Sequence, residues 1–238
     1  MIFTAMTARG RRTAEEIMAD LLPTPQAQAR HEAELAAERE KNIVAYQEAA
    51  GPVLAELAAA GFEVKTIGEL RRLGSRAKAA MPIIVKWLTL VSHDPLRVEI
   101  LGVLSVRWAK AAAPFLIEGF QRAPSAPDGL SQYRWTIGNA LAEAATDDVF
   151  ADVVRLARDR RYGRDREMLA VALGRMRNPQ AVDVLLDLLA DDELAGHAVI
   201  ALGTLKATRA APALRRMRDH PKRWVRNEVG KALRKIGE

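Results

Sequence analysis

Four histidines are the side chains in this sequence best suited to metal binding or to proton transfer near neutral pH: His31, His93, His197 and His220. No two of them lie within four residues of each other, and the chain has no His-Glu-x-x-His motif and no cysteine. Metal sites in proteins draw several such ligands from closely spaced positions. We therefore expect no metal site and no cofactor.

Two acidic clusters are the other residues that could do chemistry. They are Asp147-Asp148 and Asp191-Asp192-Glu193, and both fall where helices are predicted to begin. Carboxylates at a helix start accept hydrogen bonds from the free N–H groups of the first turn, so capping explains both clusters. The chain also lacks a nucleophile elbow, a phosphate-binding loop and a dinucleotide-binding glycine motif. We expect no catalytic residues and no enzymatic activity.

Positive charge gathers near the C-terminal end of the chain. The net charge is +6, and residues 1–130 carry 16 basic against 15 acidic side chains, whereas residues 206–235 carry 11 against two. Three interpretations of this excess stay open: a solvated polar end of the fold, a surface for an acidic protein, or a surface for nucleic acid. The candidate binding residues are Arg215, Arg216, Arg218, Lys222, Arg223 and Arg226.

The elements that must position these residues repeat along the chain. Leu173-Gly174 and Leu202-Gly203 are each followed, twelve residues after the leucine, by another leucine. Six equivalent leucines are spaced 28, 40, 32, 29 and 31 residues apart, namely Leu73, Leu101, Leu141, Leu173, Leu202 and Leu233. The longest interval contains a breaker-rich insertion at residues 122–129. A period near 30, in a chain with few aromatic residues, predicts an all-α array of helix pairs.

Glycine follows the key leucine in four of these copies. Gly74, Gly102, Gly174 and Gly203 each occupy this position. Glycine inside a helix costs about 1 kcal/mol relative to alanine, so its recurrence predicts that neighbouring backbones approach closely there. For Gly74, the end of a helix is an equally good explanation.

Two sequence motifs of the repeat resemble those of a known family. Val225-Arg226-x-x-x-x-Lys231-Ala232-Leu233 and Arg166-x-x-x-x-x-Ala172-Leu173-Gly174 resemble HEAT repeats, and are most similar to the short phycobilisome-lyase-like kind. The resemblance covers about residues 66–237. It implies a right-handed α-solenoid of about five helix pairs followed by a terminal helix. An arginine stands seven residues before the key leucine in three copies (Arg134, Arg166 and Arg226), and we expect these arginines to make hydrogen bonds between repeats.

The resemblance leaves the function open, because such arrays serve many tasks. Deoxyhypusine hydroxylases, which are HEAT-like, bind iron through several His-Glu pairs, but this chain has one, His31-Glu32. HEAT-like alkylpurine DNA glycosylases combine a catalytic aspartate with tryptophans. Here none of the four tryptophans is followed by Trp or Asp, so that motif does not transfer either: Trp87, Trp108, Trp135 and Trp224. A lyase activity acting on bilins is a third possibility that rests on the resemblance alone.

The first 62 residues are predicted to form a helical extension ahead of the solenoid, which we assign to residues 63–238. A helix should start at Thr24-Pro25 and run to about Ala50, and Gly51-Pro52 should break it before a shorter helix. The apolar stripe of the long helix is thin, so it requires a partner surface. That surface is either the first repeat, which the helix would cap, or another chain.

These observations together predict a non-enzymatic scaffold or adaptor whose partner is a protein; the alternative is a DNA-binding or DNA-repair-like protein that uses the basic residues. One face of the second helices alternates in charge, at Glu118, Arg155, Asp187 and Arg216, which is unlike a cradle for duplex DNA. The sequence shows neither a signal peptide nor an apolar span, so we expect no membrane partner and, with no cysteine, a cytoplasmic location. The oligomeric state is left open.

Overall fold

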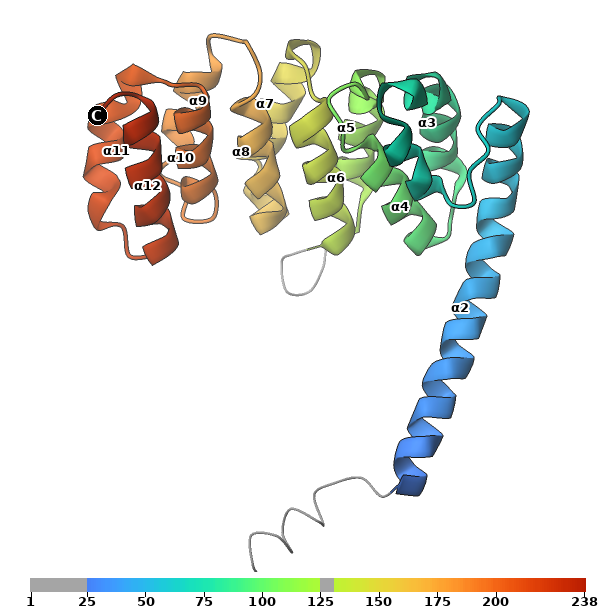
Figure 1. The fold of residues 1–238 in the computed structure, drawn as a ribbon. Helices are drawn as coiled ribbons and strands as arrows, with labels where there is room; N and C mark the ends of the chain where they lie inside the picture. The colour runs from blue at the N-terminus through green and yellow to red at the C-terminus, as the bar shows by residue number, and fades with distance from the viewer. Residues whose placement is uncertain (1–24, 125–130) are drawn as a thin grey trace, which may run out of the picture. The chain divides into compact units, whose positions relative to one another are not determined.

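The computed structural model describes residues 25–124 and 131–238, and all regular structure in these residues is helical (Figure 1). The chain divides into two compact units, Met1–Glu48 and Ala49–Glu238. Residues 125–130, which include most of the insertion predicted at residues 122–129, lie outside the described residues. The all-α prediction is confirmed.

Helix pairs follow one another through the second unit. The first elements of the pairs are η1 (Ile67–Ala80), α4 (Asp94–Leu104), α6 (Gln132–Ala144), α8 (Glu167–Leu173) and α10 (Ala195–Thr204). Their partners are α3 (Met81–Leu90), α5 (Ala113–Arg122), α7 (Phe150–Arg158), α9 (Ala181–Leu188) and α11 (Ala211–Arg216), and α12 (Arg223–Lys235) closes the series. Short 3₁₀ turns precede several helices: η2 (Lys110–Ala112), η3 (Asp147–Val149), η4 (Arg160–Arg166), η5 (Thr208–Ala210) and η6 (Met217–Asp219).

The first helices of successive pairs pack side by side, with α12 on α10, α10 on α8, α8 on α6, and α6 on α4 (Figure 1). Their key leucines form the core of the array. Leu101, Leu141, Leu173, Leu202 and Leu233 are all buried, whereas Leu73, in the 3₁₀ segment η1, is only half-buried. A helix pair cannot cover its own apolar face, so stacking repeats buries these leucines and makes the array an α-solenoid.

The predicted close approach of backbones is confirmed at two glycines. A β-carbon placed on Gly174 would lie 2.6 Å from the Cα of Ala201, and one placed on Gly203 would lie 2.9 Å from the Cα of Ala232. In both cases the neighbour is the alanine that precedes the key leucine of the next repeat. The Leu-Gly phrase is therefore where α8 meets α10 and where α10 meets α12.

The prediction of close approach is wrong for Gly102, and at Gly74 the alternative explanation, the end of a helix, fits the structure. A β-carbon on either glycine would have no atom within 4 Å. Gly74 has a φ of 55°, in the left-handed region that side chains disfavour, so it serves a turn inside η1. Gly102 lies inside α4 with open space around it, and packing gives no reason for glycine there.

Helix α2 (Pro25–Ala59) continues through Pro52, so the predicted break at Gly51-Pro52 is wrong. A proline inside a helix removes one backbone hydrogen bond. Here Ala50, Val53 and Leu57, which share one face of the helix, are completely buried. Burial of this stripe in the second unit outweighs the local cost and keeps the backbone helical.

The part of α2 that belongs to the first unit is largely exposed along its described length. Its larger apolar side chains, Leu35, Ile43 and Val44, are 42%, 50% and 44% exposed. The thin apolar stripe seen in the sequence is thus present as an exposed row. The proposed division near residue 62, and the surface that covers this helix, stay predictions.

Candidate functional site

The basic residues near the C-terminal end lie on three consecutive elements. We define the basic surface by the six predicted residues, all of which are exposed: Arg215, Arg216, Arg218, Lys222, Arg223 and Arg226. Helix α11 ends at Arg216, η6 carries Arg218, and α12 begins at Arg223. Because α12 packs against both α11 and η6, the structure brings these residues together around one turn.

Helix α12 is held firmly under this surface. Its buried stripe consists of Val225, Val229, Ala232 and Leu233. Trp224 extends from its first turn onto α10, where a β-carbon on Gly196 would lie 1.9 Å from the indole ring. Glycine at position 196 therefore leaves the space that the Trp224 ring occupies. This contact fixes the start of α12 against the preceding repeat.

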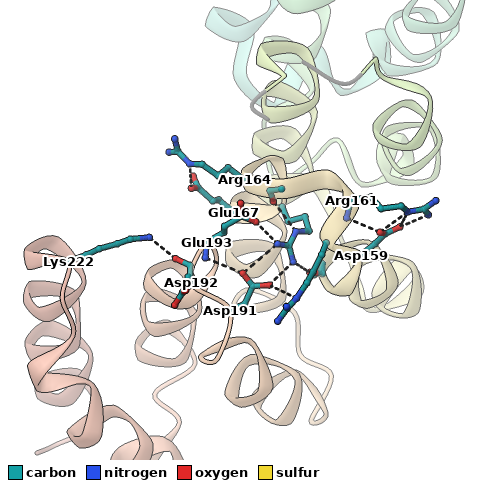
Figure 2. Close-up of polar contacts among 12 residues, drawn as sticks. Asp159, Arg161, Arg164, Glu167, Asp191, Asp192, Glu193 and Lys222 are labelled. Carbon is teal, nitrogen blue, oxygen red and sulfur yellow. Dashed lines mark hydrogen bonds and ion pairs between the residues drawn. The ribbon is translucent and has the colours of Figure 1, made fainter. Parts of the chain in front are cut away.

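Three residues of the basic surface are occupied by contacts within the chain. Arg215 forms an ion pair with Glu238. Lys222 donates from Nζ to the carbonyl oxygen of Asp192 at 2.7 Å, which links α12 to the turn before α10 (Figure 2). Arg226 donates to the carbonyl oxygens of His220 and Pro221 at 2.6 and 2.9 Å. These side chains stabilise the last repeat as well as contributing charge.

The other three residues of the basic surface are different. In the described ranges, Arg216, Arg218 and Arg223 have no acidic partner and no hydrogen bond from their guanidinium groups, and all three are exposed. A guanidinium group carries five donors in a fixed plane, which suits carboxylate and phosphate groups. These three arginines are the part of the basic surface available to a partner.

The arginines of the repeat motif have a different role, as predicted. Arg134 is 3% exposed and donates from Nε to the carbonyl oxygen of Phe120 at 3.0 Å. Its Nη1 pairs with Asp165 of the next repeat at 3.0 Å, and its guanidinium lies 4.9 Å from the ring centre of Tyr162. The arginine thus connects the preceding helix pair to the following one, and the prediction of inter-repeat bonding is confirmed.

Arg166 repeats this arrangement one unit later. It is 1% exposed and bonds the carbonyl oxygen of Ala157 at 3.0 Å on one side. On the other side it reaches Asp191 at 2.9 Å and Glu193 at 2.7 Å, which Figure 2 shows side by side before α10. Burial alone would raise the pKa of Asp191, but the bonds and charge of Arg166 lower it below the usual range. Asp191 therefore stays ionised as the buried partner of Arg166.

Arg226 occupies the equivalent position in the last copy but is exposed. It retains the contacts to carbonyl oxygens of the preceding turn, while no carboxylate of a following repeat reaches it in the described residues. The expected inter-repeat bond is thus absent at Arg226. The motif arginine alone does not determine the bond, since the next unit must supply the acid.

The acidic clusters cap fewer helix N-termini than the sequence predicts. Asp191 accepts from the backbone N–H of Glu193 at 3.1 Å, as a cap would. Asp147, however, makes no such bond to its own helix; it accepts from the N–H groups of Arg177 and Asn178 in the next unit, at 2.9 and 3.1 Å. The capping prediction is therefore wrong for Asp147, because the turn of the following repeat lies closer to this carboxylate.

The histidines are dispersed. His93 and His220 accept backbone hydrogen bonds through Nδ1, and His31 is exposed on α2. His197 is half-buried. Its Nε2 lies 4.0 Å from Glu167, and its ring packs 5.5 Å from that of Trp224. Over the ranges 25–124 and 131–238, no group of three or more His, Asp or Glu side chains could hold a metal ion. In the same ranges, no helix is both long and apolar enough to cross a membrane.

One surface feature was missed by sequence reasoning. A groove of about 1500 Å³ follows the turns between the first and second helices of successive pairs. The only hint in the sequence is that charged residues recur just after the key leucines, as at Arg107, Arg175 and Arg177. Their convergence depends on the stacking of the repeats.

Comparison with known proteins identifies the architecture. The PBS lyase HEAT-like repeat family matches residues 165–191, which run from the acid that binds Arg134 to the acid that binds Arg166. This is a HEAT-like repeat protein. The matched segment is one unit of the HEAT-like array, and the other units follow from the repeated packing of the key leucines. No curated protein and no solved structure matches the chain significantly.

Proposed function

We propose that this HEAT-like repeat protein is a non-catalytic scaffold that binds an acidic protein through its basic surface. The observation that supports the proposal most directly is the set of three exposed, unpaired arginines, Arg216, Arg218 and Arg223, on a rigidly packed end of the array. Repeat arrays offer extended surfaces for protein partners, and charge complementarity speeds and orients association. The buried stripe of α12 fixes the backbone at Arg223, so binding there requires ordering of the side chain but not of the helix.

Charge reversal of the three free arginines tests this proposal. Proteins captured from nuclease-treated native lysate by the wild-type chain should be lost with the Arg216→Glu, Arg218→Glu, Arg223→Glu variant. A matched variant, Arg30→Glu, Arg39→Glu and Lys41→Glu on α2, changes the net charge equally at exposed positions and should retain them. Capture of the same acidic proteins by the first variant would contradict the proposal.

Nucleic acid is the second candidate, favoured by the same three guanidinium groups. Binding to phosphates predicts that affinity falls with salt at a log–log slope of about −0.9 per phosphate neutralised. The alternating charges on the second helices weigh against a long duplex footprint. Three of these four residues, Glu118, Arg155 and Asp187, form ion pairs with neighbouring side chains. Absence of binding to duplex and single-stranded DNA at about 50 mM salt would remove this candidate.

The absence of catalysis is part of the proposal. The name of the matched family raises a lyase activity on bilins, and no cluster of ionisable groups in the described ranges supports it. Incubation of the purified chain with a bilin should leave the absorption spectrum of the pigment unchanged. A shifted spectrum that persists through gel filtration would overturn this part of the proposal.

A further inference from the structure

The groove along the repeat turns is distinct from the basic surface. Its wall begins at Lys78, at the end of η1, and continues over the turn that holds Arg107 and Lys110. It then crosses residues 143–149 and 174–177 and ends at Thr204-Leu205. Each of five consecutive units thus contributes the turn between its two helices. A groove built in this way repeats its chemistry at the spacing of the helix pairs.

The acids of the groove are already engaged by the protein itself. Glu143 forms an ion pair with Arg175 and lies 3.9 Å from Arg107. Asp147 accepts two backbone N–H groups of the next unit, and Asp148 accepts from the hydroxyl of Thr146 at 3.1 Å. Glu143 and Asp147 thus hold neighbouring turns together, while Asp148 bonds within its own turn. In the described residues, only Glu143 among these three acids has cationic partners.

Three cations of the groove are not engaged. Lys78, Lys110 and Arg177 are exposed, and their charged groups have no acidic partner in the described part of the chain. They come from three different units, so they are distributed along the groove. The groove lining has five basic against three acidic side chains, so its net charge is positive, and the free cations come from the first, second and fourth units.

Apolar side chains lie between these cations. Trp108, Pro114 and Leu205 line the same groove, with Trp108 and Leu205 half-buried and Pro114 exposed, whereas Met176 in its wall is 3% exposed. A wall that alternates free cations with apolar surface suits a polypeptide that alternates carboxylates with apolar side chains. Asp147 and Asp148 have no cationic partner in the described residues. They therefore repel a phosphate backbone, which carries a negative charge at every step, more than a segment whose carboxylates are spaced apart.

The repeat spacing also indicates the conformation of the occupant. Packed helices lie about 8–10 Å apart, and an extended chain advances about 3.3 Å per residue. About three residues of an extended segment therefore span one unit. We infer that the groove binds an extended acidic segment of a partner protein, whose carboxylates meet Lys78, Lys110 and Arg177 while its apolar side chains contact Trp108.

A designed peptide tests this inference with the full-length chain. The probe is a fluorescein-labelled peptide in which Glu-Ser-Leu is repeated four times, and its binding is followed by fluorescence polarisation at about 50 mM salt. The Lys78→Glu, Lys110→Glu, Arg177→Glu variant should bind about tenfold more weakly or worse, because three charge contacts are reversed. In the wild type, binding should also change the tryptophan emission, and Trp108→Phe should remove that change.

Two controls keep this test separate from that of the proposed function. The variant with Arg216, Arg218 and Arg223 changed to Glu carries the same charge reversal on the basic surface and should bind the peptide like the wild type. A peptide with lysine in place of glutamate should not bind. The three groove residues are exposed and unpaired, so their variant should keep the thermal melting temperature of the wild type; if it does not fold, the corresponding alanine variant replaces it.

Three outcomes would overturn the inference. They are no binding of the acidic peptide to the wild type, equal binding by the groove variant, and loss of binding only in the basic-surface variant. A single-stranded oligonucleotide that competes with the peptide in the groove, and binds more tightly than it, would assign the groove to nucleic acid instead.

Discussion

Arg134 and Arg166 each join two neighbouring repeats through one buried guanidinium group. In both cases the carbonyl oxygens come from the helix pair before, and the carboxylate comes from the segment that leads into the next one. A buried charge that loses its partner is costly, so such a contact locks the register between repeats. Arg226 shares the sequence position without this burial.

This difference predicts unequal effects of the same substitution. Arg166→Ala should lower the free energy of unfolding by about 3 kcal/mol, because it removes the buried cation of Asp191 and leaves only the exposed Arg160, 3.7 Å away. Arg226→Ala removes exposed contacts and should cost about 1 kcal/mol or less. Urea unfolding followed by circular dichroism measures both. Similar losses in the two variants would show that the acid of the next repeat is unimportant.

His197 makes the stability depend on pH. Burial lowers its pKa below the ordinary value near 6.5, although the Glu167 carboxylate opposes this shift. The unfolded chain therefore takes up a proton at a higher pH than the folded chain does. Above about pH 6.5, His197 is neutral in both states and the free energy of unfolding has its full value. It decreases as the pH falls from the ordinary pKa toward the lowered one, because there the unfolded chain binds a proton at this residue and the folded chain does not.

Replacement of this histidine tests the pH dependence. From pH 7.5 to pH 5.5, the wild type should lose more free energy of unfolding than the His197→Gln variant, which has no group to protonate at that site. His31→Gln, at an exposed position on α2, serves as the control and should behave like the wild type. Equal pH dependence in all three proteins would exclude His197 as the source.

The Leu-Gly motif lies in two different packing environments along the array. Between α8 and α10, glycine at position 174 lets the Cα of Ala201 approach so closely that no β-carbon fits. In α4, the glycine at position 102 faces open space. Packing therefore requires glycine at position 174, directly after α8, whereas at position 102, inside α4, glycine costs helix stability without a packing reason.

Alanine at the two positions should have opposite effects. Gly174→Ala forces backbone against backbone and should destabilise the chain by about 1–3 kcal/mol. Gly102→Ala should raise the free energy of unfolding by up to about 1 kcal/mol, because alanine favours the helix and meets no atom. The melting temperatures of the two variants, compared with that of the wild type, test both predictions. A stabilised Gly174→Ala protein would contradict the observed approach of α8 and α10.

At the scale of the whole molecule, the array gains its stability from contacts between neighbouring units. In repeat proteins, the total is close to a sum of repeat and interface terms. Helices α8 and α10 have a neighbouring first helix on both sides. Residues 26–48 of α2 are largely exposed, and isolated helices are marginal in water.

Amide hydrogen exchange should therefore differ along the chain. In α8 and α10, exchange should require opening of the array and be slow, whereas in residues 26–48 it should be faster by orders of magnitude. Mass spectrometry of pepsin fragments gives both rates in one experiment. Slow exchange in residues 26–48 would contradict this expectation and would mean that a partner or a second copy covers the exposed row of Leu35, Ile43 and Val44.

The repeat and its buried leucines could be predicted from the sequence. Each unit must bury the same side of its first helix, so the key leucines recur in every copy and are readable without coordinates. The period also located the motif arginines, although the expected inter-repeat bond is absent at Arg226, and the local charge excess located the basic residues. The break at Gly51-Pro52 was mispredicted, because local helix rules do not include the burial of Ala50, Val53 and Leu57.

The tertiary structure alone decided which copies of a residue are used, and how. Asp165 and Asp191 meet Arg134 and Arg166 across about a repeat length of sequence, and no local pattern pairs them. The division of the basic surface into bound and free arginines depends in the same way on side-chain contacts, such as that of Lys222 with Asp192. The groove exists only because five turns stack beside one another. Contacts between repeats depend on the distance and direction between packed helices, and a sequence period specifies neither.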